Sequence, residues 1–338
     1  MTGGSGFLGT AIIRELLEDA SPLQVKELRV LDLRSLKYNE DERISFIQGD
    51  VRDQETLSDA CRNADLVIHS AAIVDWGTKS EEEVLDVNLE GTSRVIAACR
   101  AMGVKALLYT SSLDVLYDGN PLLDVDEHTP YPDRHATSYC ASKYLAEKSV
   151  LEANGDQLST CSLRPADIYG EGDPYHIGSL INMAKGGFYV RLGNGRARCQ
   201  HVYVGNMAHA HVLAAAALFN GSGTVNGQAY LVSDGPPSNF FTFFDSFVEG
   251  AGYRIRPKNL WLPRWFAYGI GCISEAMAFL LRPVRRYSPK MSRFAVTYTC
   301  TDYTFSTEKA RRDLGFVPKY SQQEAYERTV GYFKKPDR

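Results

Sequence analysis

The sequence has no paired cysteines, no large excess of either charge and no repeated or low-complexity segment. Its seven cysteines are scattered and contain no CxxC pair, which argues against a disulfide framework or a zinc site and favours a reducing compartment. Lys and Arg number 37 against 41 Asp and Glu, so the net charge is −4 and no basic surface for nucleic acid is implied. With 338 residues, of which 44% are hydrophobic, the chain has the composition of a globular protein of about two lobes.

A secretory signal is also missing, because residues 1–9 have neither a basic start nor an apolar core. These residues, MTGGSGFLG, form a glycine-rich turn that needs a buried strand before it, yet only Met1 and Thr2 precede the turn. We therefore expect an incomplete N-terminus: either the numbering starts late on a longer natural chain, or the first strand is missing. That strand is central in a doubly wound sheet, so its loss would expose both neighbouring strands.

Apolar runs alternate with amphipathic stretches in the first half of the chain. Runs typical of strands occupy residues 28–32, 44–51, 65–72, 105–112 and 161–165. Between them apolar residues recur at helical spacing, as at Leu8, Ile12 and Leu16. Strands separated by helices need crossover connections, so the pattern predicts an α/β fold with a Rossmann-type, doubly wound parallel sheet.

The pattern loosens beyond about residue 175, where glycine turns separate shorter elements. We predict a dinucleotide-binding domain over residues 1–175 and a smaller C-terminal substrate-binding lobe over residues 176–338. Within that lobe, residues 265–281 are apolar except for Ser274 and Glu275. This stretch is at the short limit for spanning a bilayer, and a glutamate near its middle is costly there.

Two interpretations of this apolar stretch stay open: a buried helix of the second lobe, or a helix that lies on a membrane surface. Basic residues flank it on both sides, which favours anionic lipid headgroups as neighbours. They are Arg264, Arg282, Arg285 and Arg286. Residues 265–286 are thus a candidate membrane-associated segment, at the endoplasmic reticulum membrane or another cytosol-facing membrane, with the cytoplasm as the alternative location.

The glycine-rich turn predicts a dinucleotide site. Gly3, Gly6 and Gly9 recur every three residues and lead directly into a predicted helix over residues 8–17. Phe7 and Leu8, beside these glycines, belong to the same predicted site. In such a turn the first glycine permits a tight bend, the second lets the backbone approach a pyrophosphate, and the third allows close helix packing. The N-terminus of the helix then offers N–H groups and a positive dipole end to the phosphates.

Asp32 extends this site, because it stands at the end of the next predicted strand. A carboxylate there can accept hydrogen bonds from both ribose hydroxyls of NAD and would repel the 2′-phosphate of NADP. NAD is therefore the predicted cofactor, and Arg34 keeps NADP use open. Asp50 and Val51 follow a later strand where the adenine ring would lie, and the small Ala71 would let the cofactor pass close to the backbone.

Tyr139 and Lys143 are the candidate catalytic base and its activator. Oxidation of a secondary alcohol needs a group that accepts the hydroxyl proton, and a tyrosine with a pKa of about 10 can do so only beside a cation. These two residues are four apart on a predicted helix and share a face. Tyr144 and Lys148 have the same spacing, but five residues turn a helix by about 140°, so both pairs cannot face one cleft.

Ser111 and Ser112 decide between the two pairs. They end a predicted strand at the C-terminal edge of the sheet, where open α/β sheets bind ligands. A serine there can hold the substrate oxygen while Tyr139 accepts its proton. We therefore assign catalysis to Ser112, Tyr139 and Lys143, with Ser111 as the alternative to Ser112, and interpret the other pair as an exposed helical pair.

Two further groups of residues allow a functional interpretation, one as a metal site and one as a contact with a sterol. His209 and His211 point in different directions on a predicted helix and have no evident third ligand, so no metal is predicted. The phenylalanines within residues 240–244 favour core packing over contact with a sterol.

Together the motifs resemble those of extended short-chain dehydrogenases/reductases. The resemblance rests on TGGSGFLG (2–9), Asp32, TSS (110–112), YCASK (139–143) and LRPADIYG (163–170). Further segments are similar to the 3β-hydroxysteroid dehydrogenase/isomerase family, including its 42E-type members. These segments are SAAIVDWG (70–77), DVNLEGT (86–92), VLEANG (150–155) and HVYVGNMAHAHVLAA (201–215).

The resemblance implies a role for each matching residue. Tyr139 would be the catalytic acid/base, Lys143 the partner that lowers its pKa and a ligand of the cofactor ribose, and Ser112 the residue that positions the oxygen. Pro165 joins the cofactor site. Asn88 either takes part in a proton relay or packs its helix against the active site.

The sequence therefore predicts an enzyme that oxidises a 3β-hydroxyl of a steroid or sterol to the 3-ketone with NAD. The ketone would acidify the adjacent carbon, so a Δ5-to-Δ4 isomerisation is a natural companion, although no dedicated isomerisation base is evident. Sterol 4α-carboxylates, which would then lose CO2, are variant substrates. The alternatives are a nucleotide-sugar epimerase or dehydratase on the same fold, and a dinucleotide sensor, which would be expected to lack Tyr139 and Lys143. A homodimer is left open.

Overall fold

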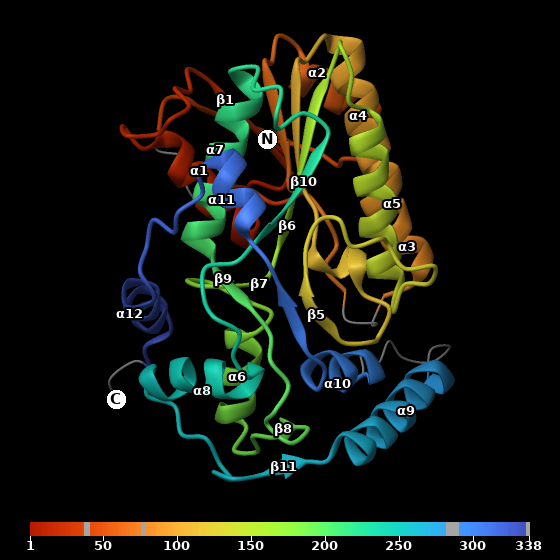
Figure 1. Ribbon diagram of the computed structural model, residues 1–338, viewed down its shortest axis with the longest axis vertical. Helices are drawn as coiled ribbons and strands as arrows, with labels where there is room; N and C mark the ends of the chain where they lie inside the picture. The colour runs from red at the N-terminus through yellow and green to blue at the C-terminus, as the bar shows by residue number, and fades with distance from the viewer. Residues whose placement is uncertain (37–40, 76–78, 282–290, 336–338) are drawn as a thin grey trace.

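The computed structural model describes residues 1–36, 41–75, 79–281 and 291–335 (Figure 1). They form an α/β fold with a parallel main sheet covered by helices on both faces, which confirms the predicted fold class. The strands of this sheet lie in the spatial order β2 (Ile44–Gln48), β1 (Leu28–Asp32), β3 (Leu66–His69), β4 (Ala106–Thr110), β6 (Ser159–Pro165) and β10 (Gln228–Val232).

Met1 and Thr2 join the two halves of the main sheet, between β1 and β3. Thr2 forms parallel bridges to Leu31 and His69. Its N–H donates to the Ile68 carbonyl at 3.0 Å, and the N–H of Leu31 donates to the Met1 carbonyl at 2.8 Å. Both neighbouring strands are therefore buried, contrary to the expectation that they would be exposed, because two residues of backbone satisfy their facing hydrogen bonds. The expectation of an incomplete N-terminus stays a prediction.

Hydrophobic side chains of β1, β2, β3 and β4 alternate between two cores, one on each face of the sheet. On β4, Ala106 and Leu108 belong to one core, and Leu107 and Tyr109 to the other. The first core is covered by α1 (Phe7–Leu17), α7 (Val204–Phe219) and α11 (Glu308–Leu314), and the second by α2 (Gln54–Cys61), α4 (Gly91–Met102) and α5 (Ser138–Glu152). Burial on both faces explains why the strands read as continuous apolar runs.

Short elements connect and extend this framework. The helix α3 (Glu81–Leu85) and the π-helix η1 (Asp86–Glu90) lead into α4, and the 3₁₀-helix η2 (Leu113–Leu116) follows β4. Three two-stranded pairs lie toward one end of the main sheet: β7 (Asp167–Tyr169) with β9 (His201–Tyr203), β5 (Leu122–Val125) with β12 (Tyr303–Phe305), and β8 (Arg191–Leu192) with β11 (Trp261–Leu262). The remaining helices there are α6 (Ile177–Lys185), α8 (Phe240–Gly250), α9 (Arg264–Leu281), α10 (Arg293–Thr299) and α12 (Gln322–Phe333).

The main sheet draws on residues beyond the predicted boundary at residue 175. β10 pairs with β6 along its whole length, and α7 packs against α1. Part of the main sheet thus lies beyond the predicted boundary at residue 175, because the chain returns to the sheet after building part of the second lobe. The division into a dinucleotide-binding domain over residues 1–175 and a substrate-binding lobe over residues 176–338 stays a prediction. The sequence of β10, QAYLV, is too short a run to show a period of its own.

α9 lies along the outer edge of the second lobe, beside α10 (Figure 1). Most of its large apolar side chains are exposed, with Trp265 at 76% and Leu280 at 73%. The interpretation of residues 265–281 as a buried helix is therefore wrong. None of the described helices combines the length and hydropathy that a bilayer crossing requires. The flanking Arg282, Arg285 and Arg286 lie outside the described residues.

Candidate active site

One cleft of about 1170 Å³ lies along the C-terminal edge of the main sheet. Small-molecule pockets usually measure about 300–1,000 Å³, so this cleft has room for a cofactor and a substrate together. Each residue predicted to bind cofactor or to catalyse lines it: Gly3, Gly6, Phe7, Leu8, Gly9, Asp32, Asp50, Val51, Ala71, Ser112, Tyr139, Lys143 and Pro165. The fold thus brings together the full predicted set.

The glycine turn is shaped so tightly that side chains could not replace its hydrogens. Gly3 has φ +74°, and a Cβ on it would lie 2.6 Å from the backbone nitrogen of Ala71. A Cβ on Gly9 would lie 2.1 Å from the Gly3 carbonyl oxygen. The residue before α1, Gly6, supplies no side-chain cap, so the N–H groups of the first turn of α1 could bind an anionic group in the cleft. These residues fit the pyrophosphate of a dinucleotide.

Asp32 is held at the rim of the cleft by one backbone N–H of the glycine turn and one of the segment that follows β1. Its Oδ2 accepts from the Ser5 N–H and its Oδ1 from the Arg34 N–H, both at 3.0 Å. Each carboxylate oxygen keeps a lone pair for a ribose hydroxyl. The guanidinium of Arg34 lies 4.0 Å from Asp32 and is 74% exposed. Both charges are therefore close to the place expected for the ribose that carries a 2′-hydroxyl in NAD and a 2′-phosphate in NADP.

Tyr139, Lys143 and Glu147 form a buried stripe on α5, each four residues after the last. Glu147 pairs with Arg164 of β6 at 2.8 Å, and this contact ties α5 to the main sheet. The Lys143 ammonium donates to the carbonyl of Thr110, the last residue of β4, at 2.6 Å. The stripe therefore aims Tyr139 and Lys143 at the strand end that also carries Ser112.

The electrostatics of the chain raise the pKa of Tyr139 well above its ordinary value. Burial is the main cause and the carboxylate of Asp114 adds to it, while a hydrogen bond with Ser112 acts in the opposite direction. Burial also lowers the pKa of Lys143 to about 7. The predicted lowering of the Tyr139 pKa is thus not a property of the chain alone, because burial of the phenolate outweighs the hydrogen bond with Ser112.

Asp114, which sequence reasoning missed, orients the Ser112 hydroxyl through hydrogen bonds. The Ser112 hydroxyl donates to Asp114 Oδ2 at 2.7 Å, and the N–H of Asp114 donates back to the Ser112 oxygen at 3.2 Å. Burial raises the pKa of Asp114 to about 7. The only sequence signal for this residue was a carboxylate two positions beyond Ser112.

The part of the cleft beyond Ser112 combines aromatic and charged groups. Phe294 and Tyr298 of α10 line it together with Asp167 and His176. The Tyr298 hydroxyl donates to Asp167 Oδ1 at 2.7 Å. Burial by itself lowers the pKa of His176, but the carboxylates of Asp173 and Asp167 raise it to about 9. The wall of this part of the cleft therefore contains charged and polar side chains as well as aromatic rings, whereas a purely hydrocarbon substrate would need apolar contacts alone.

The members of the second tyrosine–lysine pair have partners away from the cleft; Lys148 is exposed as predicted, whereas Tyr144 is half-buried. The Tyr144 ring stacks on His135 with centroids 4.7 Å apart, and Lys148 lies 3.9 Å from Glu152 on the exposed side of α5. Neither member lines the cleft.

Other conspicuous side chains also have structural partners. His209 contacts Glu15 of α1 at 2.8 Å, whereas His211 contacts Thr110 at 2.8 Å, so the two histidines point apart. The phenylalanines within residues 240–244 pack into the hydrophobic core and do not line the cleft.

Asn88 connects three segments behind the cleft. Its amide oxygen accepts from the Ile73 N–H at 2.7 Å, and its amide nitrogen donates to the Ile73 carbonyl and to the Ser142 hydroxyl, both at 3.0 Å. These contacts pack η1 against α5, which is the second of its two predicted roles; a proton relay stays a prediction.

Residues 1–264 match the 3-beta hydroxysteroid dehydrogenase/isomerase family. The chain is 37% identical to 3 beta-hydroxysteroid dehydrogenase type 7 from Homo sapiens, over 98% of this chain and 94% of that protein. It is 34% identical to short-chain dehydrogenase/reductase family 42E member 1 from Xenopus laevis, over 99% of this chain and 89% of that protein.

Solved structures with the same fold include enzymes of nucleotide sugars. A dTDP-glucose 4,6-dehydratase from Streptomyces venezuelae, with NAD bound, superimposes with a TM-score of 0.75 at 21% identity, covering 98% of this chain and 95% of that one. A UDP-glucose 4-epimerase from Thermus thermophilus, in complex with NAD, gives 0.72 at 24% identity, over 98% and 97%. At such identities the likeness shows the fold alone. The near full-length match to the relatives above shows more: this chain belongs to the 3-beta hydroxysteroid dehydrogenase/isomerase family and is an oxidoreductase that uses a nicotinamide dinucleotide.

Proposed function

We propose that this protein oxidises the 3β-hydroxyl group of a steroid or sterol to the 3-ketone, with NAD as the preferred oxidant. The observation that carries the proposal is that Ser112, Tyr139 and Lys143 line the same cleft as the glycine turn and Asp32. A proton acceptor and a dinucleotide cradle in one cleft are what dehydrogenation of an alcohol requires. The family of the chain supplies the class of alcohol.

The residues divide the reaction between them. NAD, when bound, accepts the hydride from the carbinol carbon. Ser112 holds the substrate oxygen, and the phenolate of Tyr139 accepts the hydroxyl proton. Protonated Lys143 favours that phenolate and would also bind the ribose next to the nicotinamide. The backbone around Gly6 would hold the pyrophosphate.

A Δ5-to-Δ4 double-bond shift is part of the proposal, since the new ketone acidifies the carbon next to it. This step needs a group that takes a proton from one carbon and returns it to another. Asp114 supports it, because its carboxyl lines the cleft beside Ser112 and its pKa of about 7 suits proton transfer in both directions. With a sterol 4α-carboxylate the ketone would instead promote loss of CO2.

The test is a substrate panel with the purified full chain. We expect reduction of NAD, followed by its absorbance, with 3β-hydroxy-Δ5 steroids or sterol 4α-carboxylates, and a 3-ketone by mass spectrometry. UDP-glucose and dTDP-glucose form the comparison arm. Turnover of a nucleotide sugar without turnover of any sterol would overturn the steroid assignment, and a parallel series with NADP measures the cofactor preference.

We also propose that α9 attaches the protein to a cytosol-facing membrane, with its axis along the surface. Its exposed apolar side chains include Trp265, Ile273 and Leu280. Burying each such side chain in lipid contributes about 1.5–3 kcal/mol. The double variant Trp265→Ser/Leu280→Ser should therefore weaken vesicle binding at least about tenfold. Leu123→Ser, at an equally exposed leucine on β5, is the matched control, and equal losses in both would contradict the proposal.

A further inference from the structure

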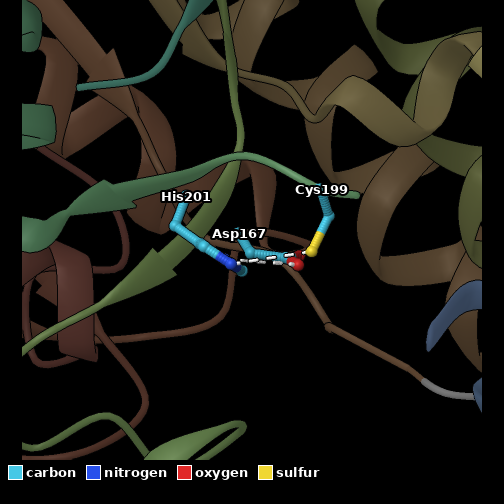
Figure 2. A group of neighbouring side chains, drawn as sticks. All are labelled: Asp167, Cys199 and His201. Carbon is cyan, nitrogen blue, oxygen red and sulfur yellow. Dashed lines mark hydrogen bonds and ion pairs between the residues drawn. The ribbon is translucent and has the colours of Figure 1, made fainter. Parts of the chain in front are cut away.

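A thiol, an imidazole and a carboxylate come together where β7 lies beside β9 and the residues that precede it (Figure 2). The cause is strand register: β7 and β9 are parallel neighbours, and Asp167 stands opposite His201. Cys199 precedes His201 by two residues, and side chains two apart on an extended chain point to the same face. The three side chains point toward one another in Figure 2.

The distances leave polar atoms of this group without a direct hydrogen bond. Cys199 Sγ forms a hydrogen bond of 3.6 Å with His201 Nε2, whereas Asp167 Oδ2 lies 3.9 Å from His201 Nδ1, which is beyond hydrogen-bond length. Within the described part of the chain, neither Asp167 Oδ2 nor His201 Nδ1 has a hydrogen-bond partner, although His201 is only 3% exposed. Buried polar atoms in this situation call for an ordered water or an ion.

We propose that Asp167, Cys199 and His201 bind a transition-metal ion of the zinc class. One ligand atom from each residue lies within 4.8 Å of the others, and ligands that share a tetrahedral zinc ion stand about 3.3–3.6 Å apart. Cys199 Sγ faces Nε2 of His201, whereas Asp167 Oδ2 faces Nδ1, and an ion binds only one of these two nitrogens. A rotation of the Cys199 or the Asp167 side chain would bring all three ligand atoms to the same ion.

The chemistry of the donors selects the ion. Sulfur, nitrogen and oxygen ligands suit zinc, whereas Mg²⁺ and Ca²⁺ prefer oxygen alone. A thiolate and a carboxylate together balance the two positive charges. The fourth position falls to water or to His176, whose Nε2 lies 3.7 Å from Asp167 Oδ1.

The position of the ion assigns it a structural task. Asp167 lines the cleft and accepts the Tyr298 hydroxyl at 2.7 Å, so a metal on its other oxygen would fix both side chains in the cleft wall. Metal binding can be tested without assuming the proposed oxidation, because two of the three ligands, Cys199 and His201, do not line the cleft.

The experiment measures metal binding directly. The full chain is stripped with a chelator, reloaded with Zn²⁺ or Co²⁺, passed through gel filtration and assayed for metal content and for the thiolate-to-cobalt absorption band. We expect one ion per chain and the band in the wild type. Cys199→Ser should lose the band, and Asp167→Asn and His201→Gln should weaken binding at least about tenfold.

Cys161→Ser is the matched control, because Cys161 is equally buried but lies in β6. It should keep both metal and band. The proposal is overturned if the wild type holds no more metal than Cys199→Ser, or if Cys161→Ser removes the band as completely. Should a ligand variant fail to fold, the stoichiometry, the cobalt band and a zinc-dependent rise in Tm of the wild type decide by themselves.

Discussion

The cofactor part and the substrate part of the cleft are built in different ways. The cofactor part consists mainly of backbone from one turn, residues 3–9, with Asp32 at its rim. The substrate part consists of side chains from separate segments, among them Asp114 of η2, Asp167 of β7 and Tyr298 of α10. A backbone cradle needs specific residue types at fixed spacing, whereas a wall of side chains needs only that distant segments meet.

Tyr139→Phe should give the largest effect and should separate the two parts. Removing only the proton acceptor is expected to lower the rate by about 10²–10⁴-fold while dinucleotide affinity stays unchanged. Steady-state rates and calorimetric titration with NAD measure the two properties. Tyr144→Phe, on the same helix but away from the cleft, is the control; a near-normal rate in Tyr139→Phe would mean that another group takes the proton.

Glu147→Gln should affect the cofactor part and the substrate part of the cleft together. Glu147 ties α5 to the main sheet, and α5 carries Tyr139 and Lys143, which line the cleft. Leaving Arg164 buried without its partner is expected to lower the free energy of unfolding by about 3–5 kcal/mol. Denaturant titration measures this loss, with the exposed Glu308→Gln as control. A loss below 1 kcal/mol, on the order of a surface pair, would contradict this role.

The same ion pair sets a pH dependence of stability. Burial raises the pKa of Glu147, but Arg164 outweighs this and holds the pKa below its ordinary value. The stabilising contribution of the ion pair is therefore fully present at pH values above the pKa of Glu147 in the unfolded chain, about 4.3. It is lost as the pH falls through the lower pKa of Glu147 in the folded protein. In Glu147→Gln this acid-side loss should be smaller than in the wild type.

Asp32→Ala should affect the cofactor part alone. The loss of a charged hydrogen-bond acceptor for the ribose is expected to reduce the preference for NAD over NADP by about tenfold to 100-fold. The ratio of kcat/KM for the two cofactors measures it, and KM for the sterol should not change. Asp19→Ala, at an exposed position after α1, is the control; an unchanged ratio would count against the ribose role.

Asp114→Asn should give the smallest effect, confined to the substrate part. Because the Asp114 carboxylate raises the pKa of Tyr139, its neutral replacement should shift the rise of kcat/KM to lower pH. The wild-type profile should also contain a transition near the Asp114 pKa of about 7, and the variant should lack it. The pH profile distinguishes this from a purely structural role, which would lower the rate equally at every pH.

The difference between the two parts also explains how much could be predicted. Gly9, Asp32 and Tyr139 were identified because each is constrained locally, by a turn, a strand end or a helical spacing. Asp114 was missed although it follows Ser112 by only two residues, since a carboxylate in a loop has no distinguishing pattern. The cluster of Asp167, Cys199 and His201 had no predictor either, because strand register decides it.

By itself the sequence determined the α/β class, the glycine turn and the shared face of Tyr139 and Lys143 on α5, since all three arise from periodicity and spacing within short segments. Tertiary structure decided the rest: that β10 returns to the main sheet, that α9 is exposed, and that burial and Asp114 raise the pKa of Tyr139. The physical reason is that burial and electrostatic fields depend on which distant residues become neighbours, and no local pattern records that.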